Sequence, residues 1–148
     1  MMFEILKKYK THGFYDFTLQ DSYRECCNAP VDQSGIYLIY KMVYDCEILI
    51  YIGSSGQREK KNTLKTRKGG MKDRLTNGYH PNKFGETKRI KRSIAFPKCM
   101  QNANIDKIRI YWWVTYDNEN FDFPTDVETI LRNDYLLRNR CLPEWHSH

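Results

Sequence analysis

The chain has 148 residues, of which 41% are hydrophobic and 28% are charged, and it carries five cysteines and a net charge of +6. This length suits one domain with its own hydrophobic core, and the composition excludes a disordered chain. The sequence contains neither an apolar run near the ~20 residues of a membrane span nor the features of a secretion signal. We therefore expect a cytoplasmic protein with reduced thiols.

The first third of the chain contains one clear helical pattern. Phe3, Leu6 and Tyr9 recur at helical spacing, which predicts a short helix over residues 2–10. Residues 11–34 contain several turn-forming residues. We expect this stretch to be irregular and to end in a turn that leads into a strand.

Three segments have the composition of β-strands. Residues 35–41 and 47–53 are rich in β-branched and aromatic side chains, and the five residues between them predict an antiparallel hairpin. Residues 107–116 alternate most regularly, which indicates a strand with one face on a core. The face expected to be buried carries Ile108, Ile110, Trp112, Val114 and Tyr116.

Helices are expected after the hairpin and after the third strand. Residues 54–70 are polar and predict a loop, whereas 71–77 and 88–96 predict short helices. A longer helix is expected to begin with Thr125 as its N-cap, and Glu128 follows at the spacing of a capping box. Together the elements predict an α+β domain, with a small three-stranded antiparallel sheet flanked by helices.

Basic residues are concentrated in one segment. Residues 58–98 hold fourteen of the 24 Lys and Arg and three of the 18 Asp and Glu, so this segment alone carries +11 and the rest of the chain −5. A charge block of this kind is typical of a surface that binds a polyanion. The alternative is a solvated surface that only keeps the protein soluble.

Two tripeptides on the predicted hairpin are specific. Gly35-Ile36-Tyr37 opens the first strand, and Tyr51-Ile52-Gly53 closes the second, with thirteen residues between them. In this order and at this spacing they resemble the paired motif of the GIY-YIG nuclease family. The resemblance runs from about Gly35 to Trp145. It implies a small stand-alone bacterial member, of the restriction-endonuclease kind, with an N-terminal extension (1–34) packed on the nuclease domain (35–148).

The resemblance implies four principal site residues. Tyr37 and Tyr51 would point into one site, Arg74 would come from the following helix, and Glu128 would hold one divalent metal ion, Mg²⁺ or Mn²⁺. The chemistry agrees, because Mg²⁺ keeps several waters and one carboxylate can suffice, and because a guanidinium can brace phosphoryl oxygens bidentately. A tyrosine can act as the general base only if nearby cations lower its pKa from ~10. We expect Tyr37 to be the base and Tyr51 to orient it.

Three positions stay open. Arg67 competes with Arg74 because both follow an apolar residue at the same spacing. The family often adds a histidine or tyrosine after the arginine, for which His80 or Tyr79 is the candidate. His146 stands where the resemblance would place an asparagine near the metal.

These features predict a metal-dependent DNA endonuclease, with a homodimer as one route to double-strand cleavage. The cations expected to contact DNA phosphates are Lys65, Arg67, Lys68 and Lys72. Two alternatives are open: a catalytically silent nucleic-acid-binding module on the same fold, and a protein-interaction domain whose basic loop binds an acidic partner. A capping role alone is a further alternative for Glu128.

Overall fold

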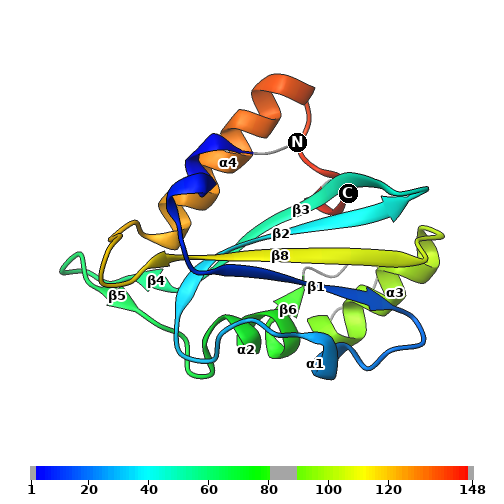
Figure 1. The fold of residues 1–148 in the computed structure, drawn as a ribbon, viewed down its shortest axis with the longest axis horizontal. Helices are drawn as coiled ribbons and strands as arrows, with labels where there is room; N and C mark the ends of the chain where they lie inside the picture. Colours follow the sequence, from blue (N-terminus) through cyan, green and yellow to red (C-terminus); the bar gives the residue numbers. More distant parts are fainter. Residues whose placement is uncertain (1–2, 81–89, 147–148) are drawn as a thin grey trace.

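The computed structural model describes residues 3–80 and 90–146, which form an antiparallel sheet with helices on both faces (Figure 1). The sheet has the strand order β1 (His12–Thr18), β8 (Lys107–Tyr116), β2 (Ser34–Val43) and β3 (Cys46–Ser55). One face is covered by the 3-10 helix η1 (Glu4–Lys8) and by α4 (Pro124–Asn139). The other face packs against α1 (Tyr23–Cys26), α2 (Gly70–Asn77) and α3 (Arg92–Asn102), and the short helix η2 (Glu144–His146) contacts β3. The described residues also contain two small antiparallel strand pairs: β4 (Gln57–Arg58) with β5 (Leu64–Lys65), and β6 (Tyr79–His80) with β7 (Ile90–Lys91).

The α+β class predicted from the sequence is confirmed, but the prediction of a three-stranded sheet was wrong. The additional strand is β1, which lies in the stretch expected to be irregular and pairs with β8 from His12 against Trp113 to Thr18 against Lys107. Its core contribution is limited to Tyr15 and Phe17, because it is an edge strand of seven residues. Gly13 and Asp16 are also uncommon in strands, so the local signal was weak.

Strand β2 is buried on both faces, which explains its nearly unbroken apolar sequence. Tyr37 and Ile39 face the α1–α2–α3 side. Ile36, Leu38 and Tyr40 face η1 and α4. The first motif of the sequence therefore lies on a strand in the centre of the molecule, with its tyrosine on the side of α2 and α3.

The β2–β3 hairpin is tighter than expected and contains one irregularity. Val43 pairs with Cys46, so the turn consists only of Tyr44 and Asp45, both with positive φ as in a type I′ turn. Further along, Ile39 pairs with Tyr51 and Tyr40 with Leu49. The extra residue, Ile50, forms a bulge that puts Ile50 and Tyr51 into the same core.

The predicted helices are found with changed boundaries. The structure has α2 at Gly70–Asn77 and starts α3 at Arg92; residues 81–89, which include part of the predicted 88–96 helix, lie outside the described residues. Residues 54–70 are not a simple loop, because they form the β4–β5 hairpin. The short helix predicted over residues 2–10 is the 3-10 helix η1, and the spacing of three residues between Phe3, Leu6 and Tyr9, which are buried, matches it.

Helix α4 does not begin as predicted. Pro124 is its first residue, Phe123 is the N-cap, and no side chain caps the helix. Thr125 is therefore not the N-cap and Glu128 is not part of a capping box. The reason is that Pro124 fixes φ at a helical value and its missing N–H would have no partner at a helix start, so the helix begins at Pro124 and the N-cap lies two residues earlier than predicted.

The structure also shows the state of the cysteines and whether any described helix could span a membrane. All five cysteines are free, and Cys27 and Cys99 are buried. Among the helices within residues 3–80 and 90–146, none is long and apolar enough to cross a membrane.

Candidate active site

The two motif glycines permit close contacts that any side chain would prevent. A Cβ at Gly35 would lie 1.8 Å from the carbonyl oxygen of Trp113 on the neighbouring strand β8. A Cβ at Gly53 would lie 2.5 Å from the ring of Tyr37, which is directly opposite in the β2–β3 pairing. Gly35 therefore allows β2 and β8 to approach, and Gly53 leaves the space that the Tyr37 ring fills.

The two motif tyrosines lie side by side in the core under β2 and β3. Their rings are stacked with centroids 6.2 Å apart. Tyr37 is fully buried, and its hydroxyl has no hydrogen-bond partner among the described residues. Tyr51 is 9% exposed, and its hydroxyl accepts a hydrogen bond of 3.2 Å from Nη2 of Arg92. The structure thus brings both predicted tyrosines together, in different environments.

Two histidines flank Tyr51. His146 of η2 stacks on its ring with centroids 4.3 Å apart, and the Nε2 of His146 accepts a 3.0 Å hydrogen bond from the backbone N–H of Ile52. An imidazole that accepts at Nε2 is neutral and carries its proton on Nδ1. His80 is buried and lies 5.7 Å from the Tyr51 ring, whereas Tyr79 is half exposed. Of the two candidates after the arginine, His80 is therefore the one beside the tyrosines.

Arg92 is a residue of this site that the sequence analysis missed. Its side chain is completely buried, and its guanidinium carbon lies 5.7 Å from the ring centroids of both Tyr37 and Tyr51. By sequence it counted only as one cation of the basic segment. The available signal was its spacing on the helix, because it falls on the same face as the buried Phe96 and Cys99.

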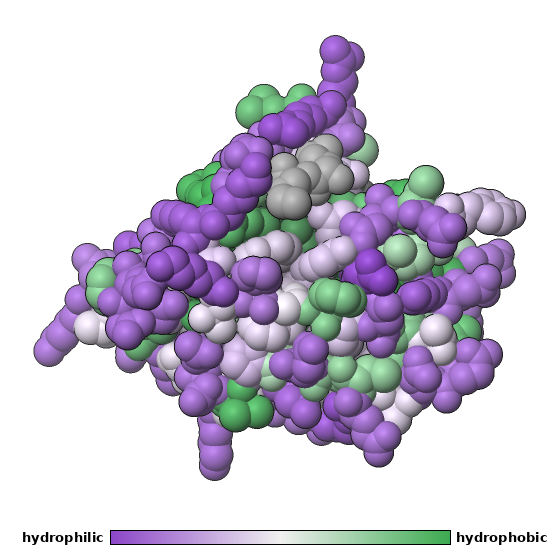
Figure 2. Space-filling model, in the orientation of Figure 1, coloured by the Kyte–Doolittle hydropathy of each residue, from purple (hydrophilic) through white to green (hydrophobic). Residues whose placement is uncertain are grey.

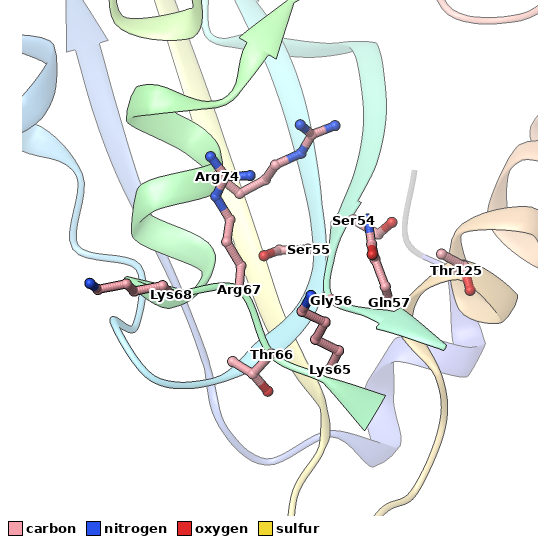
Figure 3. Close-up of a pocket in the computed structure, with 10 residues that line it drawn as sticks. All are labelled: Ser54, Ser55, Gly56, Gln57, Lys65, Thr66, Arg67, Lys68, Arg74 and Thr125. Carbon is pink, nitrogen blue, oxygen red and sulfur yellow. The ribbon is translucent and has the colours of Figure 1, made fainter. Parts of the chain in front are cut away.

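An open pocket of about 440 Å³ lies beside the end of β3, between the β4–β5 hairpin and the start of α2 (Figure 3). Its lining is mostly polar and cationic: Ser54, Ser55, Gly56, Gln57, Lys65, Thr66, Arg67, Lys68, Arg74 and Thr125. Figure 3 shows Arg74 reaching from α2 toward β3, above Arg67. A pocket with this lining is suited to a phosphate-bearing ligand.

The pocket distinguishes the two candidate arginines. Arg67 is held by Asp73, which accepts a 2.6 Å hydrogen bond from its Nε. The guanidinium of Arg74 has no hydrogen bond or ion pair within residues 3–80 and 90–146. Arg74 is therefore available to a ligand without first breaking an internal ion pair.

Glu128, on α4, contacts the end of strand β3 next to the pocket. Its Oε1 accepts a 2.5 Å hydrogen bond from the hydroxyl of Ser54, the residue directly after the second motif. Its Oε2 accepts a 3.2 Å bond from Arg132 one turn later. The carboxylate that the sequence placed in a capping box is instead attached to the hairpin that carries the tyrosines.

The donor set fits a hard divalent ion held by one carboxylate. Among the described residues there is no cluster of three or more His, Cys, Asp or Glu, which would be needed for a cage built wholly of side chains. Glu128 does not itself line the pocket, but it bonds to Ser54, which does. A single carboxylate beside an open polar pocket suits Mg²⁺, which keeps several waters and binds substrate oxygens. The stacked His146 uses Nε2 for the backbone of Ile52, so that nitrogen is not available as a metal ligand.

The electrostatics of Tyr37 reflect both burial and charge. Burial raises the pKa of Tyr37 to about 12, and the positive charge of Arg92 is the largest effect in the opposite direction. Arg74 also lowers this pKa, whereas the charge of Glu128 raises it. The charges of all three residues therefore act at the hydroxyl of Tyr37, although they come from α2, α3 and α4.

The cations expected to contact DNA fall into two groups. Lys65, Arg67 and Lys68 line the pocket, whereas Lys72 does not, and its charge acts on the thiol of Cys27. Arg58 anchors the β4–β5 hairpin to the start of α4, through an ion pair with Asp126 and a cation–π contact with Phe123. Figure 2 shows a mostly hydrophilic surface over this hairpin.

Comparison of the chain with protein-family models, with curated proteins and with solved structures found no significant match. The motif residues and the geometry of the site are therefore the observations that point to a function.

Proposed function

We propose that the protein is a metal-dependent endonuclease that hydrolyses phosphodiester bonds in DNA, on a fold that resembles the GIY-YIG domain. The observation that carries this proposal is the meeting of separate elements at one end of the β2–β3 hairpin. Ser54, directly after the second motif, lines the pocket together with Arg74 and bonds to Glu128. The charges of Arg74 and Glu128 both act at Tyr37 of the first motif.

Each side chain has a role in the proposed reaction. Because the Tyr37 hydroxyl is fully buried in this structure, the reaction requires that this hydroxyl become accessible to the pocket when substrate binds. Its phenolate then takes a proton from the attacking water, the water oxygen bonds to phosphorus, and the bridging oxygen leaves. Arg74 donates hydrogen bonds to the phosphoryl oxygens as charge develops on them. Glu128 would hold a divalent cation, which supplies charge neutralisation at the phosphoryl group when bound. Tyr51 orients Tyr37 through the stacked rings.

DNA is the proposed partner because cations dominate the pocket and its surroundings. Lys65 and Lys68 are exposed beside Arg67 and Arg74, so a phosphate backbone at the pocket would meet several positive charges. One chain holds one such site, and double-strand cleavage would take a homodimer or two successive nicks. The function proposed here is consistent with a cytoplasmic protein.

Cleavage of supercoiled plasmid, with and without Mg²⁺, tests the proposal. We expect nicked and linear products that disappear with a chelator. In Glu128→Gln the amide oxygen can still accept from Arg132 and the amide N–H can donate to the Ser54 hydroxyl, so the variant should fold and bind DNA normally. It should lose activity by at least ~10²-fold, as expected when an electrostatic group of the reaction is removed. Glu119→Gln, at an exposed carboxylate paired with Lys10, is the matched control. Full activity of Glu128→Gln would contradict its assignment as metal ligand.

A second candidate function is a catalytically silent DNA-binding module. It is favoured by one observation, the burial of the Tyr37 hydroxyl with its pKa raised to about 12. This alternative predicts salt-dependent DNA binding without cleavage under any divalent metal. The plasmid assay combined with a binding assay separates the two functions.

A further inference from the structure

Arg92 is unusual because a fully buried cation needs compensation that its surroundings provide only in part. Moving a charge out of water is costly unless it is paired and hydrogen-bonded. Within the described residues no carboxylate bonds to Arg92, and its Nε has no partner. Its two other nitrogens donate to neutral oxygens, the hydroxyl of Tyr51 and the backbone carbonyl of Arg74.

The contacts of Arg92 join the groups that the proposed reaction uses. Nη1 donates a 3.1 Å bond to the carbonyl of Arg74, near the C-terminal end of α2, where a cation is favourable. Nη2 donates to Tyr51, and the guanidinium lies equally close to the rings of Tyr37 and Tyr51. One side chain therefore connects the helix of the candidate catalytic arginine with both motif tyrosines.

The backbone around Arg92 leaves room for this arrangement. A Cβ at Gly78 would lie 2.3 Å from the carbonyl oxygen of Arg74 and 3.0 Å from Nη1 of Arg92. The backbone N–H of Arg92 bonds to the carbonyl of Gly78 at 2.9 Å. The end of α2 and the start of α3 are thus joined twice, once through the backbone and once through the guanidinium.

A purely structural role would use Arg92 only to join α2 and α3, and a hydrophobic side chain of similar volume often does that equally well. The position of the Arg92 charge indicates an electrostatic role in addition to the structural one. The guanidinium of Arg92 lies beside both motif tyrosines, 5.7 Å from each ring centroid, and its charge opposes the effect of burial on the Tyr37 hydroxyl more strongly than any other group does.

We propose that Arg92 is a positioning residue of the nuclease site: it holds the Tyr51 hydroxyl and the backbone of Arg74 in place and supplies a fixed positive charge that favours the anionic form of Tyr37. The proposal rests on the proposed function, and it assigns a role to a residue that does not contact substrate. The groups that act on the Tyr37 hydroxyl are Arg92, Tyr51, Arg74 and Glu128.

The first experiment measures the Tyr37 hydroxyl without requiring cleavage. Fluorotyrosine incorporated at position 37 of the full chain is titrated by ¹⁹F NMR in the wild type and in Arg92→Met and Arg92→Lys. Arg92→Met should move the titration to higher pH by at least about one unit, the usual effect of removing a nearby opposite charge from a titrating group. Arg92→Lys keeps the charge and should restore most of the shift.

The second experiment measures the single-turnover cleavage rate against pH for the same variants. Arg92→Met should displace the rise in rate to higher pH by the same amount, so that the rate near neutral pH falls about tenfold for each unit. The matched control is Arg24→Met, because Arg24 also bonds to α2, through the side chain of Asn77, but from the exposed surface. That control should leave both the titration and the pH profile unchanged.

The outcomes separate this inference from the proposed function. A folded Arg92→Met with an unchanged ¹⁹F titration overturns the role of Arg92, whatever the cleavage assay gives. If Arg92→Met shifts the ¹⁹F titration but the wild-type protein never cleaves DNA, the proposed nuclease function is overturned and the electrostatic role of Arg92 remains. If Arg92→Met does not fold, Arg92→Lys decides: it should cleave at least about tenfold more slowly with little change in the pH profile, since it loses a bond to Tyr51 or Arg74. A wild-type rate in Arg92→Lys overturns the positioning role.

Discussion

The buried tyrosine cluster and the open pocket lie at the same end of the β2–β3 hairpin, yet they are opposite environments. In the cluster, Tyr37 and Arg92 are inaccessible to solvent and one cation faces aromatic rings. In the pocket, Arg74 is partly exposed and points toward β3, and the lining also includes the exposed Lys65 and Lys68 (Figure 3). A charge acts strongly in the first environment because water is excluded, whereas the second is accessible to a large anionic substrate. Residues of the cluster should therefore tune reactivity, and residues of the pocket should bind the phosphate.

The sharpest test of this comparison is the choice between the two arginines of the pocket. Arg74→Met should reduce the single-turnover rate by about 10³-fold or more, the effect of removing an arginine that stabilises phosphoryl transfer. Arg67→Met should reduce it far less, because Arg67 is already paired with Asp73. Rates at saturating DNA and Mg²⁺ measure both. Equal losses would mean that Asp73 only positions Arg67 and that both guanidinium groups contact the phosphate.

Within the cluster, the two tyrosines should respond differently to loss of the hydroxyl. Tyr37→Phe should slow cleavage by about 10² to 10⁴-fold, as for a general base. Tyr51→Phe should cost less, because its hydroxyl is engaged by Arg92 and serves orientation. Single-turnover rates from pH 6 to 10 check this. If Tyr51→Phe were inactive and Tyr37→Phe fully active, Tyr51 would be the general base and Tyr37 the orienting residue.

The buried hydroxyl of Tyr37 also predicts a pH dependence of folding stability, which can be measured without substrate. The pKa of Tyr37 is raised to about 12 by burial, so the neutral phenol is favoured in the folded state. Its contribution is fully present below the unfolded pKa of ~10 and is lost as the pH rises from there to about 12, amounting to roughly 2–3 kcal/mol. Urea unfolding at pH 8 and pH 11 should show a smaller loss for Tyr37→Phe than for the wild type. The same loss in both proteins would argue that the hydroxyl is hydrated.

Gly53→Ala should disturb the cluster without changing any charge. The added methyl would lie within 2.6 Å of the Tyr37 ring and hydroxyl, so the ring or the strand must move. We expect a destabilisation of about 1–3 kcal/mol, the usual cost of an extra methyl in a packed core. Denaturant unfolding measures this destabilisation. Gly13→Ala provides a comparison at a second strand glycine, where the nearest atoms belong to the side chain of Trp112. Unchanged stability of Gly53→Ala would show that the Tyr37 ring is free to shift.

The smallest effect is expected for the exposed lysines of the pocket. Lys65→Ala combined with Lys68→Ala should weaken binding to unrelated DNA sequences alike and reduce the salt dependence by about two units of slope, one for each lost phosphate contact. The control is the pair Lys7→Ala and Lys10→Ala, which removes the same charge from lysines paired with Glu4 and Glu119. If both pairs change the salt slope equally, the binding depends on net charge alone rather than on the pocket.

The hairpin, the third strand and the motif tyrosines could be predicted because their signals are local. Residues 107–116 form β8 with the predicted bounds, since side chains in a strand alternate and the alternation is visible in the sequence. The order of the two tripeptides also located Tyr37 and Tyr51 on adjacent strands. On the face predicted to be buried, Ile108, Ile110 and Val114 are buried, whereas Trp112 and Tyr116 are only partly buried. The opposite face of this strand is partly covered as well.

The edge strand β1, the bond between Ser54 and Glu128, and the burial of Arg92 could not be predicted in the same way. Each depends on residues that are far apart in the chain: β1 and β8 pair across about a hundred positions, and Ser54 and Glu128 are 74 positions apart. The sequence by itself determined which segments form strands and helices and which side chains have reactive chemistry. Only the tertiary structure decided which of those side chains are buried together and which remain open, because burial, and with it the strength of a charge, depends on packing between distant elements rather than on local periodicity.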